Sequence, residues 1–546
     1  GDVYKRQRMF STGYAAIEPV KGLKLKETLS YDYTIQKDSR YYNPLSSAGP
    51  KSGSDAQTAK GFIEYGKLIS STSLNYVHTF AHKHHLNVLA AYEIESYQTD
   101  HASGEKSKLP SDKLTEPDNA AVLNSFKSAT QAYRMISYLS RLNYDYDDRY
   151  YIAGSYRRDG SSRLSPNNRW GNFWSVSGMW HLGNENFMKA VKPVLSDVKI
   201  RASYGVNGNQ PGSYYGYKGL YSYGENYMEA AGSYESSQPN DLLTWEKNYS
   251  LNLGIDLSFI NRIFASLEYY NRDTKDLLYS LPISATTGFT SYLSNIGRLN
   301  NKGIEFELRT LNVVSNDFNW TSVFNLSHNR NKIVSLNGLL DQTIEGTWFI
   351  HKVGLPYHTF YVKEFAGVDP QTGYAQYYLN TKNEDGSYNR ELTTDADKAE
   401  SIPYKTATPK VSGGFTNILN YKWIDLTFTL TYSLGGYSFD KLGTYIENGT
   451  SSIYSSRYNL PAYMMNRWQN PGDQTDIPRF VYNESATSTN SSRYIHSTDH
   501  LRLKNFTLGF TLPNQWTQKL MIDKVRIYFS GNNLLTWAKW KQYDPE

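Results

Sequence analysis

The chain of 546 residues contains no cysteine and has few of the features that mark several common protein classes. Without cysteine, disulfide frameworks, thiolate metal sites and cysteine nucleophiles are excluded. The longest apolar stretches, such as residues 88–91, are far shorter than the ~20 residues that a membrane-spanning helix needs, which excludes a helical membrane bundle. Lys and Arg (57) barely outnumber Asp and Glu (52) and form no basic block, so the sequence predicts no nucleic-acid partner.

Aromatic residues, in contrast, are abundant. They make up 15% of the chain and include 48 Tyr, although only 39% of all residues are hydrophobic. The mean hydropathy is −0.61. Disordered chains are poor in aromatic residues, so this composition excludes disorder and indicates a large, Tyr-rich β protein.

The dominant pattern is a period-two alternation of apolar and polar residues, which places alternate side chains on opposite faces of a strand. In residues 251–259, for example, Leu, Leu, Ile, Leu and Phe alternate with Asn, Gly, Asp and Ser. A change of phase after Leu503 predicts a β-bulge around Lys504–Asn505. About sixteen strands are predicted in this way, near residues 9–18, 22–36, 60–79, 84–99, 132–146, 149–159, 172–182, 196–206, 244–258, 263–273, 302–314, 317–329, 409–420, 423–433, 500–511 and 523–532.

The gaps between these strands alternate between short turns and long loops. The long loops are predicted at 37–59, 100–131, 207–243, 274–301, 330–408 and 434–499. Short turns on one rim and long loops on the other are typical of an outer-membrane β-barrel, whereas a soluble sandwich has no reason to keep that order. The sequence therefore predicts an all-β fold: a large antiparallel transmembrane β-barrel, with apolar faces toward lipid and polar faces toward the lumen.

Particular segments resemble a known family, the SusC/RagA-type TonB-dependent outer-membrane transporters of Bacteroidetes-like bacteria. The resemblance covers nearly the whole chain in the family's order. The segments that carry it are Tyr156–Leu164 (YRRDGSSRL), Arg169–Met188 (RWGNFWSVSGMWHLGNENFM), Lys199–Gln210 (KIRASYGVNGNQ), Asn295–Leu308 (NIGRLNNKGIEFEL), Phe365–Gly373 (FAGVDPQTG), Asn466–Phe480 (NRWQNPGDQTDIPRF), Leu501–Pro513 (LRLKNFTLGFTLP), Lys524–Trp537 (KVRIYFSGNNLLTW) and Tyr543–Glu546 (YDPE).

The resemblance implies a 22-stranded barrel, of which this chain would hold about sixteen strands in residues 8–546. The family's N-terminal plug domain, its TonB box and its last strand are not visible in the sequence, so the chain is expected to be a fragment. Residues 1–7 (GDVYKRQ) fit no predicted strand and resemble a translated sequencing-adaptor artefact.

The resemblance also implies the function: TonB-dependent import of oligosaccharides, or of peptides, across the outer membrane of a Gram-negative cell. A SusD-like lipoprotein would bind substrate on the long-loop rim, and the TonB complex would act through the missing N-terminal part. A passive porin-like channel, and a soluble, secreted β-rich glycan-binding protein or adhesin, remain as alternatives. The substrate cannot be read from the chain, because contacts on long loops follow no sequence code.

Candidate ligand-contact residues lie on the Tyr-rich loop 207–243 and just beyond it, because aromatic faces offer contact area at small entropic cost. The same residues would equally serve to pack the loop or to meet a partner protein. They are Tyr214, Tyr215, Tyr217, Tyr221, Tyr223, Tyr227 and Trp245.

No motif supports an enzyme, a cofactor or a metal site. Residues 61–68 (GFIEYGKL) nearly match a phosphate-binding loop, but Leu68 replaces the required Ser or Thr and the segment reads as a strand. Four histidines in residues 78–85 do not have a recognised ligand spacing and fit a short turn. Glu305 and Glu307 share a strand face with Arg309, as expected of a polar barrel wall rather than a glycosidase pair.

Overall fold

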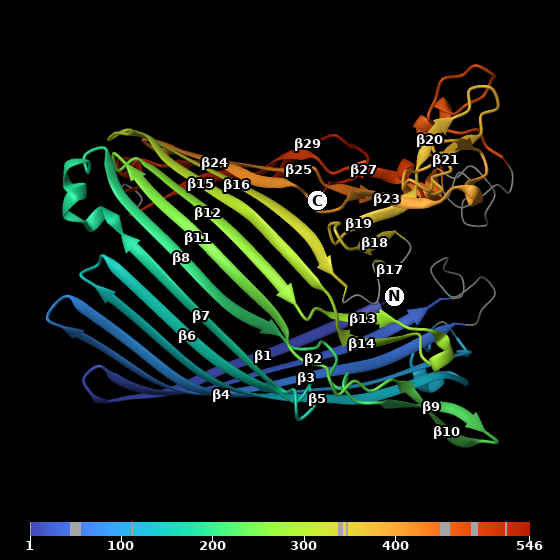
Figure 1. Cartoon of the computed structure of the whole chain (residues 1–546), viewed down its shortest axis with the longest axis horizontal. Helices are drawn as coiled ribbons and strands as arrows, with labels where there is room; N and C mark the ends of the chain where they lie inside the picture. Colours follow the sequence, from blue (N-terminus) through green and yellow to red (C-terminus); the bar gives the residue numbers. More distant parts are fainter. Residues whose placement is uncertain are drawn as a thin grey trace. The chain divides into compact units, whose positions relative to one another are not determined.

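A computed structural model describes residues 2–43, 56–111, 113–336, 342–345, 348–447, 459–481, 490–518 and 521–545, and sixteen of its strands form one antiparallel sheet in chain order (Figure 1). The strands of this sheet are β1 (Asp2–Val20), β2 (Leu23–Tyr42), β3 (Gln57–Phe80), β4 (His84–Ser107), β5 (Val122–Tyr146), β6 (Tyr150–Ser161), β7 (Trp170–His181), β8 (Leu195–Asn209), β11 (Glu246–Phe259), β12 (Ile263–Lys275), β15 (Arg298–Val314), β16 (Phe318–Ser335), β24 (Val411–Tyr421), β25 (Ile424–Leu434), β28 (His500–Thr511) and β29 (Arg526–Ala538).

Smaller elements occupy the connections. The short strands are β9 (Leu220–Tyr227), β10 (Ala230–Ser237), β13 (Leu278–Pro282), β14 (Ser291–Asn295), β17 (Gln342–Glu345), β18 (Phe349–Lys352), β19 (Thr359–Lys363), β20 (Phe365–Val368), β21 (Ala375–Tyr378), β22 (Leu392–Thr393), β23 (Ser401–Thr406), β26 (Tyr437–Phe439) and β27 (Ile495–Ser497). The short helices are η1 (Pro117–Asn119), η2 (Leu182–Asn184), η3 (Asn186–Ala190), η4 (Ala285–Thr287), η5 (Ala396–Lys398), α1 (Gly443–Ile446), η7 (Ala462–Asn466), η9 (Ser492–Tyr494) and α2 (Asn514–Thr517). No helix among the described residues is long and apolar enough to cross a membrane.

The predicted all-β fold is confirmed, and each of the sixteen sheet strands overlaps one predicted strand. The predicted bulge is confirmed as well, because the pairing of β28 with both neighbouring strands shifts by one residue at Lys504. A bulge of this kind moves the apolar side chains of one strand from one phase to the other without breaking the sheet.

Several strands are longer than predicted, so the long loops are shorter. The predicted loop 100–131 is the clearest case, since β4 continues to Ser107 and β5 starts at Val122. The added residues stay paired, with a shift of register between Glu105 and Lys106, but they show no regular alternation. Asp100 to Ser107 are mostly polar on both faces, and the apolar Leu123 and Phe126 of β5 are out of phase with each other. Where both faces meet water the apolar alternation disappears although the backbone pairing continues, and the sequence pattern stops short of the strand's end.

The expectation that residues 1–7 fit no strand is wrong. Asp2 to Gln7 belong to β1 and pair with β2, from Asp2 opposite Arg40 to Gln7 opposite Ile35. The segment was missed because its polar residues do not alternate with apolar ones. Its origin as an artefact stays a prediction. Part of the predicted loop 37–59, namely residues 44–55, lies outside the described residues.

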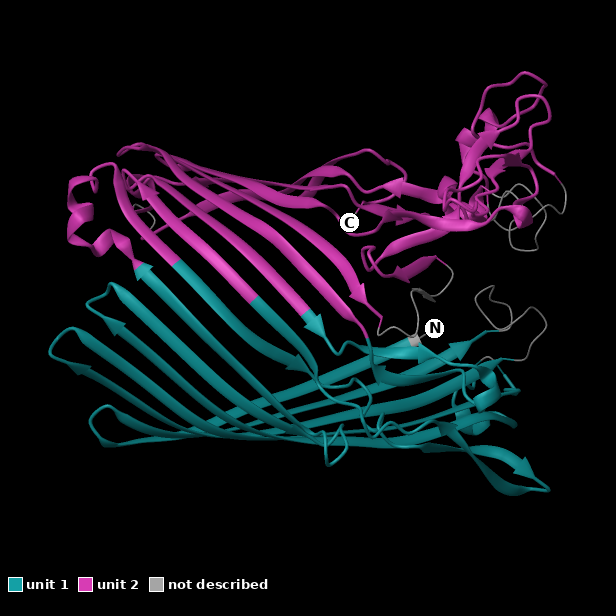
Figure 2. Ribbon diagram, in the orientation of Figure 1, with its two compact units in different colours: residues 1–180, 201–250, 274–296 teal, residues 181–200, 251–273, 297–546 magenta. Residues whose placement is uncertain are grey.

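The chain divides into two compact units, shown in different colours in Figure 2. Unit 1 comprises residues 1–180, 201–250 and 274–296, and unit 2 comprises residues 181–200, 251–273 and 297–546. Unit 1 contains β1 to β7 and the hairpins β9–β10 and β13–β14. Unit 2 contains β15 to β29, including the small sheets β17–β18–β19–β23 and β20–β21–β22, which fill the predicted loop 330–408.

One face of the unit 1 sheet is apolar and exposed. The strand register places large apolar side chains opposite one another on this face, from β2 to β7. Its exposed members are Leu25, Leu29, Tyr31, Leu68, Leu74, Val88, Tyr92, Ile94, Tyr138, Leu142, Tyr150, Ile152, Tyr156, Trp174, Val176 and Trp180.

Two rows of aromatic rings in contact with one another border this apolar face. Tyr150 stacks on Tyr146 and on Trp180 near the short turns, with ring centroids 6.4 and 6.3 Å apart. Tyr138 contacts Tyr92 and Trp170 toward the other end, at 5.3 and 6.2 Å. Trp170 and Trp180 are ten residues apart on β7, which is ~33 Å along the strand. For a strand tilted by ~40° from the barrel axis, this corresponds to ~25 Å along that axis. That height matches the apolar band of outer-membrane barrels.

The opposite face of the same sheet carries paired charges. Asp32 accepts two hydrogen bonds from Arg8, and Lys67 contacts Glu95 with its Nζ atom 3.0 Å from the carboxylate. Arg157 pairs with Glu93 and Asp159 at 3.2 and 2.7 Å. A sheet with one apolar and one charged face is the arrangement expected of a barrel wall.

In unit 2, two of the segments that carry the family resemblance dock against each other. Trp468 donates an indole N–H to the carbonyl of Pro370 (2.8 Å), and Gly472 N donates to the same oxygen (2.7 Å). Arg479 N donates to the carbonyl of Gly373, and its guanidinium lies 3.9 Å from the centroid of the Tyr374 ring. The motifs at 365–373 and 466–480 therefore form one structural element, although about a hundred residues separate them along the chain.

Candidate ligand-binding surfaces

The first part of the Tyr-rich loop packs on the charged face of the unit 1 sheet. The Arg163 guanidinium lies between the rings of Tyr133 and Tyr214, 4.0 and 4.6 Å from their centroids. Tyr214 also stacks on Tyr97 at 6.2 Å. Arg163 donates to the carbonyls of Pro211 and Gly212 at the base of the loop. Tyr214 is therefore half-buried and holds the loop against the sheet.

Tyr215 and Tyr217 have the same anchoring role. The hydroxyl of Tyr215 accepts a hydrogen bond from Ala132 N on β5, at 3.2 Å. Tyr217 packs against a buried apolar cluster built from Leu164, Phe173, Leu243 and Trp245. Trp245 itself is 3% exposed. It meets Phe173 edge-on at 5.4 Å and donates its indole N–H to the carbonyl of Arg169.

The remaining three predicted tyrosines lie on the β9–β10 hairpin and are exposed. The exposed fractions of Tyr221, Tyr223 and Tyr227 are 61%, 75% and 74%. Figure 1 shows this hairpin extending from the long-loop end of unit 1. The seven predicted residues thus separate into a buried anchor, three half-buried tyrosines and three exposed tyrosines that can meet another molecule.

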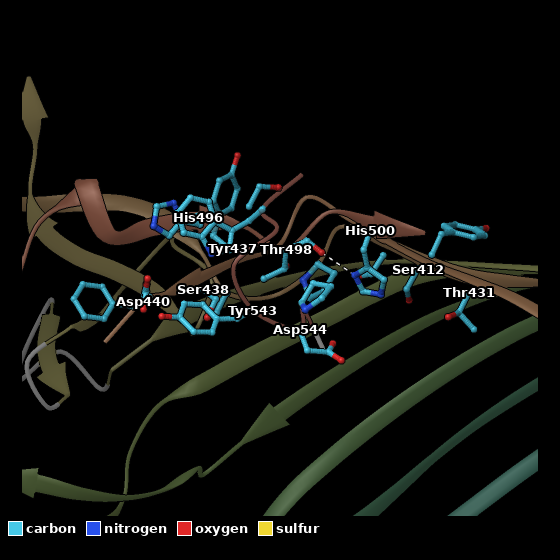
Figure 3. A pocket seen from close by; sticks show the side chains of 18 of the residues that line it. Ser412, Thr431, Tyr437, Ser438, Asp440, His496, Thr498, His500, Tyr543 and Asp544 are labelled. Carbon is cyan, nitrogen blue, oxygen red and sulfur yellow. Dashed lines mark hydrogen bonds between the residues drawn. The ribbon is translucent and has the colours of Figure 1, made fainter. Parts of the chain in front are cut away.

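A cavity of about 890 Å³ that sequence reasoning missed lies at the long-loop end of unit 2 (Figure 3). Its walls come from the first residues of β24 and β28, the last of β25, the β26–β27 pair and residues 540–545. The β26–β27 pair continues β25 and β28 beyond a break at Gly435, whose φ of +82° favours glycine. Gly435 N donates to Asp499 Oδ1 at 2.5 Å, which fixes the break.

Hydroxyl groups and aromatic rings line most of this cavity, and Asp440 adds a buried carboxylate. Asp440 is 9% exposed. Its Oδ1 atom accepts a hydrogen bond from Gly443 N at 2.7 Å, whereas its Oδ2 atom accepts none from any residue that the structure describes. The Thr431 hydroxyl, also in the lining, is likewise buried and without a partner among the described residues. No local motif marks these residues, because the cavity joins segments more than a hundred residues apart.

His496 and Trp540 stack face to face in the wall of the cavity. Their ring centroids are 3.4 Å apart and the interplanar angle is 5°. Burial lowers the pKa of the His496 imidazole below its ordinary value of 6.5, and Arg493 acts in the same direction, while Asp440 opposes the shift. The imidazole is therefore neutral at pH 7, and it gains a proton only in more acidic solution.

We expect the fluorescence of Trp540 to report this protonation, because a stacked imidazolium quenches indole emission. The difference in emission between the wild type and His496→Gln should titrate with a midpoint below pH 6.5. Protonation is disfavoured by burial, so acid must overcome the desolvation of the charged ring. A midpoint at pH 6.5 or above would contradict the buried stack. His358→Gln, which leaves this cavity unchanged, serves as the control.

Three groups near the short turns of unit 1 have the chemistry of metal ligands. One ligand atom each from His85, Asp145 and Asp148 lies within 4.8 Å of the others. Thr79 Oγ1 lies 2.9 Å from His85 Nδ1, and the Tyr151 hydroxyl donates to Asp148. Carboxylates at exposed turns gather in this way without an ion, so the cluster by itself assigns no metal. Residues 61–68, which nearly match the sequence of a phosphate-binding loop, lie inside β3. A strand paired on both sides cannot present the backbone amides that a phosphate requires.

The chain matches known proteins along nearly its whole length. A family model described as "TonB dependent receptor-like, beta-barrel" matches residues 2–534. TonB-dependent receptor P3 of Formosa agariphila is 31% identical over 560 residues, which cover 98% of this chain and 54% of the relative. TonB-dependent receptor SusC of Bacteroides thetaiotaomicron is 32% identical over 461 residues, covering 79% of this chain and 43% of the relative.

A solved structure described as that of the RagAB peptide transporter is similar throughout. It covers 100% of this chain and 60% of its own chain, at 28% identity and a TM-score of 0.88. The chain spans about half the length of the curated relatives it matches.

Proposed function

The chain belongs to the family of TonB-dependent receptor-like β-barrels, and from this we propose that it forms part of the barrel wall of an outer-membrane importer of SusC/RagA type. The protein is a transporter and not an enzyme, as its relatives are TonB-dependent receptors and transporters. The observation that carries the proposal of a membrane location is the two-faced sheet of unit 1. Its exposed apolar face, bordered by aromatic rows, suits lipid and headgroups, and its ion-paired face suits a water-filled lumen.

A charge placed on the apolar face should cost far more than one placed on the opposite face. Leu142 lies midway between the two aromatic rows on β5, is 45% exposed, and is followed by Asn143 on the charged face. We expect Leu142→Lys to destabilise the protein in phospholipid vesicles by about 2–4 kcal/mol, the cost of a lysine at the bilayer midplane. Asn143→Lys, the matched control, should change stability by less than about 1 kcal/mol. Urea unfolding from vesicles measures both, and equal effects would argue against a lipid-facing surface.

For the whole protein we propose import of oligosaccharides or peptides, with a SusD-like lipoprotein on the long-loop rim and energy supplied by the TonB complex. The exposed tyrosines of the β9–β10 hairpin support a contact with substrate or lipoprotein, because Tyr is enriched at interfaces. Tyr221, Tyr223 and Tyr227 are the residues we assign to this contact. The anchored Tyr214, Tyr215, Tyr217 and Trp245 would act indirectly, by holding the hairpin in place.

Uptake by cells tests this function. Cells lacking the intact gene should lose uptake of a fluorescent oligosaccharide or oligopeptide, and the intact gene should restore it. A protonophore should abolish the restored uptake, because the TonB complex draws on the proton gradient of the inner membrane. Uptake that survives the protonophore would instead identify a passive, porin-like channel. Recovery of the protein from cells in folded form without detergent would identify the soluble alternative.

A further inference from the structure

The buried carboxylate of Asp440 is the most unusual group in the cavity of unit 2. A buried charge is costly unless it is paired, and hydrogen bonds to both of its oxygens are the usual compensation. Only the Oδ1 atom of Asp440 has this compensation within the chain, from Gly443 N. Asp440 lines the cavity, and its buried Oδ2 atom has no hydrogen bond from any described residue.

The nearby cations are engaged elsewhere. The Lys441 ammonium lies over the rings of Trp348 and Tyr445, at 5.3 and 5.0 Å from their centroids. Arg493 pairs with Glu447 at 3.0 Å, and Arg502 pairs with Asp544. Lys405 lies over the rings of Tyr404 and Tyr437. Each side chain thus has a partner other than Asp440.

The surroundings of Asp440 suit a small cation. The same cavity is lined by the aromatic rings of Tyr437, Phe439 and Tyr543. Burial raises the pKa of the Tyr543 hydroxyl, and the nearby charge of Asp440 raises it further. Figure 3 shows Asp440, Ser438 and Tyr543 together at one end of the cavity. Aromatic faces attract cations, most strongly where water is excluded. Ser438, which lies beside Asp440 in the same lining, adds a hydroxyl group as a hydrogen-bonding partner (Figure 3).

We propose that this cavity binds the primary ammonium group of a ligand, with the Asp440 carboxylate as its counter-ion and the neighbouring rings around it. An ammonium group beside the carboxylate would offset the buried negative charge, which an uncharged hydroxyl would leave uncompensated. The inference rests on the proposed import function and narrows its substrate class to ligands with a free amine. Two sources have this chemistry: the amino terminus or lysine side chain of a peptide, and an amino sugar.

Calorimetric titration of the purified full chain in detergent tests the proposal with two pairs of probes. One pair is trialanine amide and its N-acetylated form, and the other is the glucosamine trimer and the N-acetylglucosamine trimer. In at least one pair, the probe with the free amine should bind more tightly than its acetylated form, by a factor of about ten or more. This is the effect expected of one hydrogen bond to a charged group. The pair that shows the preference identifies the source. Equal binding of both members in both pairs, or no binding, overturns the proposal.

Variants show whether Asp440 is responsible. Asp440→Asn keeps an oxygen for Gly443 N but removes the charge, and it should abolish the preference for the amine. Gly443→Ala is a second variant, because its Cβ would lie 2.5 Å from Asp440 Oδ2 and displace the carboxylate. Asp397→Asn removes an equal charge from unit 2 at a side chain that is 96% exposed, and it should leave the preference unchanged. An unchanged preference in Asp440→Asn would overturn the assignment.

This assay needs neither energy nor a partner protein, so its failure is distinct from failure of the import function. Protonophore-sensitive uptake without any preference for amines in the titration would overturn the cavity's role alone. An amine preference in the titration without protonophore-sensitive uptake would overturn the import function and leave the binding site standing.

Discussion

Replacement of Trp245 by alanine is expected to release the Tyr-rich loop of unit 1 from the sheet. Trp245 is 3% exposed and packs with Leu164, Phe173 and Leu243, so the substitution removes a large apolar surface from the centre of the cluster. Truncation of a buried Trp costs about 3–5 kcal/mol. The carbonyl of Arg169 also loses its hydrogen-bond donor, which adds to the penalty.

Hydrogen exchange measures where this loss occurs. Protection of residues 210–245 should fall in Trp245→Ala, while β3 and β4, which lie away from the cluster, keep their protection. Trp245→Phe retains most of the packing but loses the indole donor, and it should cost about 1 kcal/mol. Tyr223→Ala removes an aromatic ring that is 75% exposed and should not change protection, which makes it the matched control. Equal effects of Trp245→Ala and Tyr223→Ala would show that Trp245 is not an anchor.

Replacement of Gly373 by alanine is expected to separate the two docked motifs of unit 2. Gly373 has a φ of +72°, in the left-handed region that costs other residues about 1–2 kcal/mol. A Cβ at this position would also meet the indole ring of Trp468. Overpacking of this kind costs a further ~1–3 kcal/mol, so the total is about 2–5 kcal/mol.

Gly386 separates the two contributions, because its φ of +83° is similar and no atom lies within 4 Å of its ideal Cβ. Gly386→Ala should therefore cost only the backbone part, about 1–2 kcal/mol. Limited proteolysis is a direct measurement: cleavage within residues 466–480 should accelerate in Gly373→Ala and remain close to wild type in Gly386→Ala. Similar cleavage of both variants would mean that the contact with Trp468 does not hold the motifs together.

The sheet strands were predictable because the signal that defines them is local. Every strand of unit 1 that carries Leu, Val, Ile or aromatic residues at every second position on its exposed face was found, although β1, β4 and β5 extend well beyond the predicted bounds at one end. The bulge at Lys504 was placed correctly. The prediction stopped early in β4, where polar residues occupy both faces, and in β5, where Leu123 and Phe126 do not follow an alternation. It missed the first residues of β1 because polar and apolar residues do not alternate there either. Apolar and polar residues alternate along a strand only when its two faces have different surroundings, and the alternation is lost where both faces have the same surroundings.

The ligand-binding surfaces were less predictable. Tyr223 and Trp245 read alike in the sequence, as aromatic residues in or beside a loop, yet one is exposed and the other buried. No sequence pattern near Asp440 predicts that Trp540, a hundred residues later, lines the same cavity. These relationships depend on which distant segments pack together, and no residue pattern within a segment encodes that.

The sequence by itself determined the class of fold, the order of strands, turns and loops, and the separation of an apolar from a polar face, because each follows from neighbours within one strand or one hairpin. Only the tertiary structure decided which tyrosines are anchors, how the motifs at 365–373 and 466–480 dock, and that a buried carboxylate faces a cavity. Burial and pairing are properties of contacts between distant segments, and those contacts exist only after the chain has folded.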